Sequence, residues 1–220
     1  MVDVIETVEL EGGWRIEVSR PDDAESPRAE DNLGHIVTWT ASYLSPDDNP
    51  WARPEDFVEE MLSRLFSPGE LRAAIEAGAL SRDSDATPND DELAHAVAQY
   101  ADAPRLLGEK MAIKTVYLLD HSGVSYSTAP FGDPWDSGAV GFAWATDEDA
   151  LRWSGRAMDR AEAEGRLDEE VGRYSSWADG DTYGLELFDA DGNAVEYVAG
   201  YIGEEDLEYG VAEMKALAAA

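Results

Sequence analysis

The sequence predicts an α+β protein with a mostly antiparallel sheet of about six to eight strands, flanking helices and a helical insertion. Segments that alternate apolar and polar residues, as strands do, come in neighbouring pairs instead of alternating singly with helices. Helical patterns are concentrated between about residues 54 and 108, where they interrupt the strands. Because 44% of the 220 residues are hydrophobic, the chain can bury a sizeable core, and we expect a single domain over residues 1–220.

The first elements are strands. Residues 4–10 and 14–18 alternate apolar and polar side chains, and the Glu-Gly-Gly sequence at 11–13 between them predicts a hairpin. Residues 19–34 have the prolines, glycine and acids of a loop. The β-branched and aromatic residues of 35–43 predict the next strand.

Three helices make up the expected insertion. Residues 54–66 begin with Pro54, continue with acids in the first turn and place apolar side chains on one face. Residues 67–78 predict a second helix that ends at Gly78, and residues 89–100 predict a third. The insertion therefore separates the strand at its start from those that follow it.

Strand patterns return at residues 111–119, 124–128 and 139–145. Thr146 then predicts the N-cap of a long helix that reaches about residue 165. Thr146 and Asp149 have the spacing of a capping box, in which the two side chains satisfy each other's backbone amides.

The last part of the chain predicts a helix, a hairpin and a final helix. Residues 168–177 continue the helical pattern, and residues 204–218 form an amphipathic helix. Strand patterns at 182–188 and 194–201 flank the sequence Asp-Ala-Asp-Gly-Asn. We interpret this sequence as a hairpin turn, because it lacks the glycine spacing and the final glutamate of a calcium loop.

The charge of the chain is extreme. Sixteen basic and 48 acidic residues give a formal net charge of −32, and the acids are spread along the whole chain. This composition is typical of proteins from extreme halophiles, because molar salt shortens the Debye length to about 3 Å and screens the repulsion. A diffuse distribution fits this interpretation better than mimicry of a nucleic acid. The lack of a basic patch argues against direct nucleic-acid binding.

Composition also limits the kinds of site that the chain can hold. There is no cysteine, which excludes disulfides and thiolate metal ligands. No cofactor is evident from the sequence, and the one candidate is a divalent cation bound by oxygen ligands. The N-terminus lacks the features of a signal peptide, and no apolar run is long enough to span a membrane. We therefore expect a protein of a high-salt cytoplasm, or one associated with a virion if a virus encodes it.

One histidine follows a predicted strand directly, in the sequence Asp-His-Ser-Gly. His121 is a candidate general base or metal ligand, with Asp120 or Asp136 to orient its ring. The alternative is a tight turn in which Asp120 and Ser122 bond the backbone and Gly123 has a positive φ. Both interpretations stay open at the level of sequence.

The sequence Pro-Phe-Gly-Asp-Pro-Trp-Asp-Ser-Gly is the most distinctive loop of the chain. Asp133 and Asp136 are candidate ligands of a hard cation, or paired carboxylates with different pKa values. Phe131, Trp135 and Ser137 are candidate ligand-binding residues beside them. The alternative is structural: the prolines stiffen the loop, Trp135 anchors it, and Asp136 and Ser137 cap the next strand.

A third polar loop, Asp-Asn-Leu-Gly at residues 31–34, precedes a predicted strand. Asp31 and Asn32 are candidate ligand-binding residues that would face the other loops. We expect the DNLG, DHSG and PWDSG loops to converge at one end of the sheet, where Trp39 and Trp135 would add apolar contact.

Four segments together resemble a known family. They read SPRAEDNLGHIVTW, VYLLDHSGVSYSTAPFGDPWDSGAVGF, EEVGRYSSWADGDTYG and VEYVAGYIG, and they extend over about residues 26–203. They are similar to the SPRxxDNLG, YDHSG, PWDSGxVGF and GDxYG elements of an uncharacterised family encoded by bacteriophages and prophages. Asp133 stands where relatives carry cysteine, and Thr40 where many carry histidine. The resemblance implies a viral or proviral origin in a halophilic host, and it implies no activity.

The leading hypothesis is an accessory protein that binds a protein or small-molecule partner through the three loops. The first alternative is a hydrolase that uses His121 and aspartates, with or without a metal ion. The second is an acidic mimic that inhibits a DNA-binding protein of the host. We interpret His35 and His95 as structural, since one begins a strand and the other lies on a helix.

Overall fold

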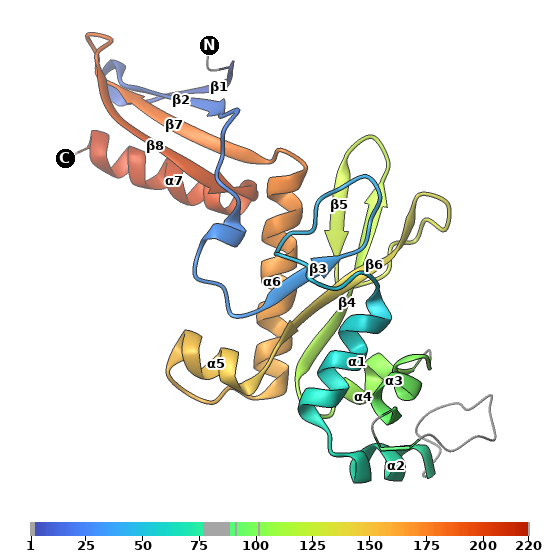
Figure 1. Ribbon diagram of the computed structural model, residues 1–220. Helices are drawn as coiled ribbons and strands as arrows, with labels where there is room; N and C mark the ends of the chain where they lie inside the picture. The colour runs from blue at the N-terminus through green and yellow to red at the C-terminus, as the bar shows by residue number, and fades with distance from the viewer. Residues whose placement is uncertain (1–2, 77–88, 91, 101, 220) are drawn as a thin grey trace. The chain divides into compact units, whose positions relative to one another are not determined.

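The computed structural model describes residues 3–76, 89–90, 92–100 and 102–219, and its chain forms two compact units (Figure 1). The first unit comprises the described residues of Met1–Glu30, Leu119–Tyr126 and Gly172–Ala220. The second comprises those of Asp31–Leu118 and Ser127–Val171. The insertion expected at about residues 54–108 therefore belongs to the second unit.

The α+β class is confirmed. The described residues form seven α-helices and eight strands, and the strands make two antiparallel sheets of four instead of one larger sheet. The first sheet has the order β1-β2-β7-β8 and the second β3-β6-β4-β5.

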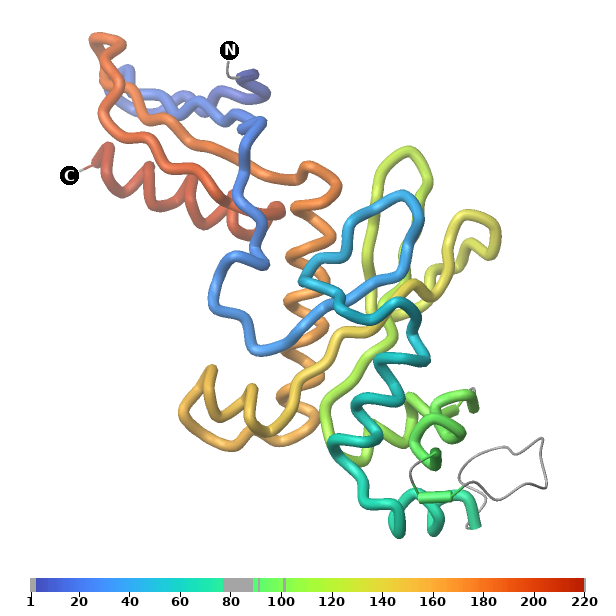
Figure 2. The backbone as a smooth tube through the Cα atoms, in the orientation of Figure 1, coloured from blue at the N-terminus to red at the C-terminus, as the bar shows by residue number. Residues whose placement is uncertain are grey.

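The first sheet contains two local hairpins and is followed by the last helix. Its elements are β1 (Asp3–Glu9), β2 (Arg15–Arg20), β7 (Thr182–Phe188), β8 (Ala194–Ile202) and α7 (Gly203–Ala218). The turn from β1 to β2 passes through Gly12 (φ 76°) and Gly13 (φ 82°), a conformation that glycine adopts without strain. Figure 2 shows both ends of the chain in this unit.

One face of the first sheet packs on α7. Ile16 and Val18 of β2 lie opposite Leu187 and Leu185 of β7, and all four side chains are buried with Met214 of α7. These residues lie at every second position of their strands, as a sheet with one covered face requires. The predicted alternation is thus confirmed by burial.

The turn between β7 and β8 is the predicted hairpin. Asp189 Oδ1 accepts hydrogen bonds from the backbone N–H groups of Asp191 (2.9 Å) and Asn193 (2.8 Å). Gly192 has a φ of 83°. Hydrogen bonds from the Asn193 side chain and these backbone groups lower the pKa of Asp189.

The remaining elements complete the second sheet and its helices. They are β3 (His35–Thr38), α1 (Pro54–Leu65), α2 (Pro68–Glu76), α3 (Leu93–Ala98), α4 (Ala103–Leu107), β4 (Ala112–Asp120), β5 (Val124–Ser127), β6 (Ser137–Ala145), α5 (Asp147–Ser154) and α6 (Arg160–Ala178). The division between the units falls within β4, β5 and α6. In the pairing of β3 with β6, His35 lies opposite Trp144 and Thr38 opposite Gly141.

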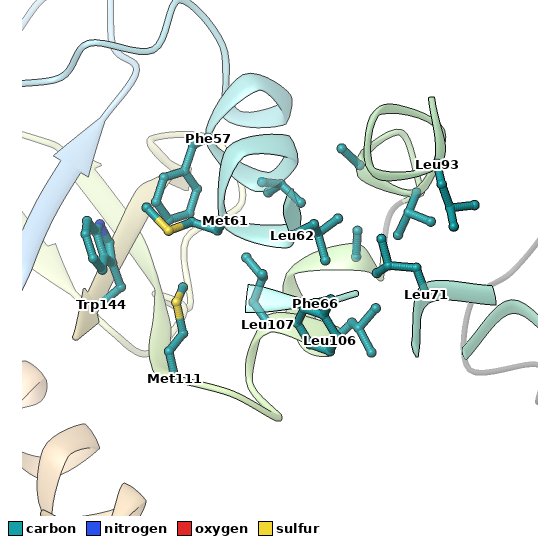
Figure 3. Close-up of a cluster of buried hydrophobic side chains, with 14 residues drawn as sticks. Phe57, Met61, Leu62, Phe66, Leu71, Leu93, Leu106, Leu107, Met111 and Trp144 are labelled. Atoms are coloured by element: carbon teal, nitrogen blue, oxygen red, sulfur yellow. The ribbon is translucent and has the colours of Figure 1, made fainter. Parts of the chain in front are cut away.

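The core of the second unit lies between the sheet and the short helices (Figure 3). Phe57, Met61 and Leu62 lie on one face of α1, and each is at most 1% exposed. They pack with Leu107 of α4 and with Trp144 of β6. The amphipathic pattern predicted for this helix is confirmed, and it ties the helices to the sheet.

Several predicted boundaries were wrong. The strand expected over residues 35–43 ends at Thr38, and the helix expected over 89–100 is limited to α3. The long helix expected from Thr146 is broken, because Gly155 adopts a left-handed φ of 70° and ends α5. The predicted stop at Gly78 lies outside the described residues. Among the described helices, none combines the length and apolar character needed to cross a membrane.

Candidate functional site

A cavity of about 540 Å³ opens on the second unit, and we call it the Trp51 cavity. It lies beside β3, the edge strand of its sheet. Its wall consists of His35, Val37, Asp47, Asp48, Asn49, Pro50, Trp51 and Trp144. The volume falls within the range of about 300–1,000 Å³ that is usual for small-molecule sites.

One side of the Trp51 cavity is formed by a segment that folds back along the free edge of β3. Asp47 Oδ2 accepts from the backbone N–H of Ile36 (2.6 Å), and Asp47 N–H donates to the Ile36 carbonyl (3.0 Å). Thr38 N–H donates to Ser45 Oγ, and Asn49 Nδ2 donates to the Thr38 carbonyl, both at 3.0 Å. The segment thus replaces a neighbouring strand and covers an edge that would otherwise stay unpaired.

The aromatic part of the wall is held in place by packing and hydrogen bonds. His35 stacks on Trp144, with ring centroids 4.3 Å apart and an interplanar angle of 23°. Trp51 packs edge-on against Phe57, with centroids 5.0 Å apart, and its Nε1 donates to Glu60 Oε2 at 2.7 Å. These contacts fix the rings of His35, Trp144 and Trp51 before a ligand binds.

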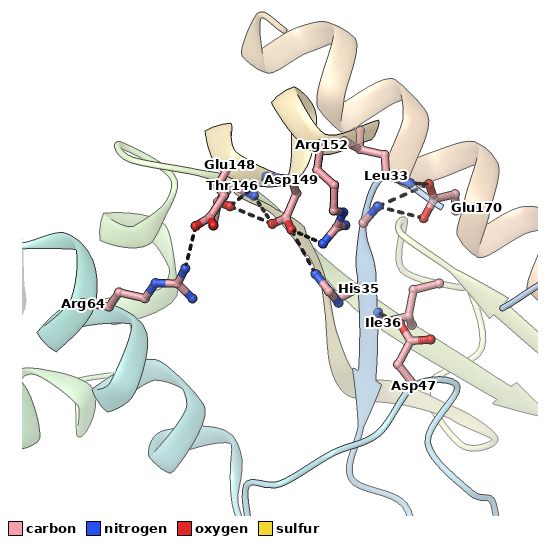
Figure 4. Close-up of polar contacts among 11 residues, drawn as sticks. Leu33, His35, Ile36, Asp47, Arg64, Thr146, Glu148, Asp149, Arg152 and Glu170 are labelled. Atoms are coloured by element: carbon pink, nitrogen blue, oxygen red, sulfur yellow. Dashed lines mark hydrogen bonds and ion pairs between the residues drawn. The ribbon is translucent and has the colours of Figure 1, made fainter. Parts of the chain in front are cut away.

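His35 is also oriented by a buried carboxylate (Figure 4). His35 Nε2 lies 3.3 Å from Asp149 Oδ1, and the Asp149 side chain is 9% exposed. Asp149 Oδ2 accepts from the backbone N–H (2.9 Å) and the hydroxyl (2.7 Å) of Thr146, which confirms the predicted capping box. Arg152 Nη1 lies 3.2 Å from Asp149 Oδ1.

The pKa of Asp149 results from opposing effects. Burial raises it, but the hydrogen bonds from His35 and Thr146 outweigh burial and hold the pKa well below its ordinary value. Asp149 is therefore ionised at neutral pH. It presents a fixed acceptor to the His35 ring.

The electrostatic character of the Trp51 cavity is negative. Asp47 and Asp48 line it, and Asp48 is exposed. No arginine or lysine belongs to the lining among the described residues. Trp144 also lines the cavity, and its buried Nε1–H has no acceptor in the described part of the chain. The wall thus combines ring faces, carboxylates and one unused donor.

The DNLG loop is tied down by its backbone. The Asp31 carbonyl accepts from Trp153 Nε1 at 3.1 Å. The N–H groups of Leu33 (2.7 Å) and Gly34 (3.3 Å) donate to Glu170 Oε1 (Figure 4). These contacts of the loop fix the start of β3. A ligand-binding role of Asp31 and Asn32 stays a prediction.

The PWDSG loop is organised by Asp133. Asp133 Oδ1 accepts from the N–H groups of Trp135 (2.8 Å) and Asp136 (3.2 Å), and the Ser137 hydroxyl donates to the Asp133 carbonyl. Trp135 is 92% exposed, so the prediction that it anchors the loop is wrong. Phe131 is half-buried.

The expected convergence of the DNLG and PWDSG loops is also wrong. Because β3 and β6 are antiparallel, Gly34 continues the register opposite Ala145, whereas the PWDSG loop runs into Ser137 at the other end of β6. Those ends are eight residue steps apart, or about 26 Å at ~3.3 Å per step. One ligand of ordinary size cannot touch both loops.

The DHSG loop belongs to the first unit. His121 N–H donates to the Gly123 carbonyl at 3.2 Å, as a tight turn requires. The positive φ falls on Ser122 (58°) and not on Gly123 as predicted. A Cβ at Gly123 would come too close to the Asp179 carboxylate, whose Oδ1 accepts from the Val124 N–H at 3.0 Å, so a larger residue would require that side chain to shift.

The two metal-binding candidates are in contact, because the Asp136 N–H donates to Asp133 Oδ1, but the catalytic candidates are divided between the two units. Asp120 and His121 belong to the first unit and Asp136 to the second, so the pairing of His121 with Asp136 stays a prediction. Asp133 and Asp136 belong to no group of three or more His, Asp or Glu side chains suited to a metal ion, within the described ranges.

The sequence interpretation missed the Trp51 cavity. We interpreted His35 as structural and named no candidate residue among residues 45–54, whose prolines and polar residues predict a loop. A usable signal was the segment Pro-Asp-Asp-Asn-Pro-Trp, which joins two acids and an aromatic ring in a short stretch. Nothing local indicates that this segment returns to β3 or that Asp149 reaches His35.

Comparison with known proteins adds no relative: the chain matches no protein family model, no curated protein and no solved structure. The resemblance to the phage-encoded family stays a prediction. Function is therefore inferred from the site itself.

Proposed function

We propose that the protein is a binding protein and that the Trp51 cavity holds a flat organic cation, such as an amidinium or guanidinium group. The observation that carries this proposal is the composition of the wall, which joins aromatic rings and two carboxylates without a lining arginine or lysine among the described residues. Such a wall attracts positive charge and repels negative charge.

The aromatic rings favour a flat, charged group. The face of an indole or phenyl ring carries negative potential, so a cation above it gains about 0.5–2 kcal/mol. Trp51 lines the cavity, and the His35–Trp144 stack supplies a planar surface in the same wall. Planar cations such as guanidinium use this geometry better than a spherical ion does, because they also stack.

The carboxylates select for the sign of the charge. Asp48 is exposed at the cavity, and Asp47 is held there by its hydrogen bonds with Ile36. A charge about 4 Å from a carboxylate gains about 1 kcal/mol in water, which is roughly fivefold in affinity. The net charge of −32 adds a general repulsion of anionic ligands at low salt.

Three probes of one shape test this proposal. Benzamidinium, benzamide and benzoate differ in charge, and isothermal titration calorimetry measures the affinity of each. Benzamidinium should bind about tenfold more tightly than benzamide, and benzoate should not bind. Equal affinities for the three probes, or tighter binding of benzoate than of benzamidinium, would refute the proposal.

A pair of variants locates the binding. Asp48→Asn should weaken benzamidinium about fivefold and leave benzamide unchanged. Asp191→Asn changes an exposed acid in the β7–β8 turn of the first unit and should change neither affinity. If both variants behave alike, the cation is held by the net charge of the chain and not by the Trp51 cavity.

A second candidate function is acid–base catalysis by His35. The contact between His35 Nε2 and Asp149 favours this function, because a carboxylate that orients an imidazole makes the imidazole a more effective general base. No serine, threonine or lysine lines the cavity in the described residues, so His35 would act on a water molecule. His35→Gln should then abolish hydrolysis of a cationic ester but only weaken benzamidinium binding, because Trp51 and Trp144 still line the cavity.

The biological setting is part of the same proposal. The acidic composition supports a halophilic host and a high-salt cytoplasm, and the resemblance of the four segments supports a viral or proviral accessory role, with a place on the virion as the alternative. Mass spectrometry of purified virions against infected-cell lysate separates these two locations.

A further inference from the structure

Two apolar side chains of the second unit are almost completely exposed to solvent. Leu44 is 90% exposed and Trp135 is 92% exposed, more than any other large hydrophobic side chain among the described residues. Exposure of such side chains to water is unfavourable relative to burial, so an interface that covers them is stabilised. Exposed aromatic residues of this kind are frequent at the centres of protein interfaces.

Leu44 and Trp135 lie at the same end of the β3–β6 pair. Thr38 is opposite Gly141, and the next residue, Trp39, donates its N–H to the Val140 carbonyl at 2.8 Å. From this end the chain continues through the loop that carries Leu44, and the loop that carries Trp135 enters β6 here (Figure 1). The Leu44 loop goes on directly to the segment that lines the Trp51 cavity.

The same two loops are acidic and contain no positive charge. Residues 39–51 and 128–140 carry four aspartates and neither lysine nor arginine. Those aspartates are Asp47, Asp48, Asp133 and Asp136. We call the two loops together the Leu44–Trp135 surface. Apolar side chains on loops that carry carboxylates and no cation are complementary to a basic surface that also offers apolar contact.

The Leu44–Trp135 surface is ordered by its own hydrogen bonds. Ser45 is bonded to Thr38, and Thr40 Oγ1 donates to the Tyr43 carbonyl at 2.8 Å. Asp133 holds the backbone next to Trp135. Loops fixed in this way lose little conformational entropy on binding, which favours their use as a docking site.

We propose that the Leu44–Trp135 surface docks a protein partner through a basic segment, one of whose arginine or lysine side chains enters the Trp51 cavity. This inference rests on the proposed function, because it names the source of the cation as a polypeptide. Leu44 and Trp135 supply the apolar contacts, and the four aspartates set the sign of the partner's charge. A free small cation would not use Leu44 or Trp135.

Selection from a random peptide library displayed on yeast tests the inference. The full chain is the bait, and the selected peptides should be enriched in arginine or lysine next to aromatic or aliphatic residues. Leu44→Ser with Trp135→Ser should weaken these peptides at least about tenfold. Free benzamidinium should bind this variant as it binds the wild type, which controls for folding and for the cavity. It should also compete with the peptides.

Other outcomes overturn the inference in distinguishable ways. If benzamidinium binds but the selected peptides are not basic, or keep their affinity for the double variant, the docking surface is refuted while the proposed function stands. If neither benzamidinium nor basic peptides bind, both fail together. If phosphatidylcholine vesicles bind through Trp135 and the basic peptides do not, the exposed side chains contact lipid and the protein partner is refuted.

Discussion

Replacing Asp149 with alanine is the sharpest test of how the Trp51 cavity is held together. The change removes the acceptor of the Thr146 N–H, the Thr146 hydroxyl and His35 Nε2. Loss of a helix cap costs about 1 kcal/mol, and leaving partners of a buried charge unpaired adds about 1–3 kcal/mol. We expect Asp149→Ala to lower the free energy of unfolding by about 2–4 kcal/mol.

Urea-induced unfolding in about 2 M KCl, followed by tryptophan fluorescence, measures this loss under screened conditions. Asp147→Ala is the matched control, because Asp147 is exposed in the first turn of the same helix α5. Only its interaction with the helix dipole is lost, about 0.3–1 kcal/mol. If the two variants differ by less than about 0.5 kcal/mol, the Asp149 network does not support the fold.

The pH dependence follows from the lowered pKa of Asp149. Because the pKa is lower in the folded than in the unfolded chain, the stabilisation is complete above the unfolded value of about 4 and is lost as pH falls below it. The difference in unfolding free energy between wild type and Asp149→Ala should thus shrink as the pH falls below about 4. A difference that grows on acidification would reverse the assigned sign.

Three further predictions concern the stability of the fold and its electrostatics. Gly141→Ala should lower the free energy of unfolding in urea by about 2–4 kcal/mol, because the new Cβ would collide with the Val37 carbonyl. Gly138→Ala lies in the same strand, where a Cβ has open space, and should lower it by less than about 0.5 kcal/mol. Equal losses would contradict the close approach of Gly141 to Val37. The side-chain hydrogen bond from Lys110, followed by those from the N–H and hydroxyl of Ser67, lowers the pKa of Glu70 to about 2. Lys110→Met should therefore raise the titration midpoint of Glu70 measured by NMR. An unchanged midpoint would exclude the ion pair between Lys110 and Glu70. Raising KCl from about 0.1 to 2 M should raise the melting temperature, because screening relieves the repulsion of 32 net negative charges; a flat or falling melting temperature would contradict the halophilic interpretation.

Local patterns predicted the local parts of the fold. The hairpin of β7 and β8 follows from alternation and a turn sequence within one short stretch, and the capping box of Thr146 and Asp149 needs only three residues of spacing. Val18 pairs with Leu185, however, and no local preference indicates a contact between such distant residues. The separation into two sheets was therefore not predicted.

The site was harder to predict because its parts come from distant segments. Polar loops at Asp31 and Asp133 gave a strong signal, but the direction of β6 relative to β3 decides whether they meet, and that direction is a property of the sheet. His35 gave a weak signal, because Asp149 is 114 residues further along the chain. The conformation of a single residue also decided a helix boundary. Gly155 adopts a left-handed conformation and ends α5, although the acidic helical pattern predicted that the helix would continue.

Both proposals depend on the binding of a flat organic cation in the Trp51 cavity. Titration of the ¹⁵N-labelled protein with benzamidinium, followed through the indole N–H signals of its seven tryptophans, tests it most directly. The signals of Trp51 and Trp144 should shift together with one dissociation constant, while that of Trp14 in the first unit should stay in place. Shifts confined to Trp14, or no shift of Trp51 at saturation, would contradict cation binding in this cavity.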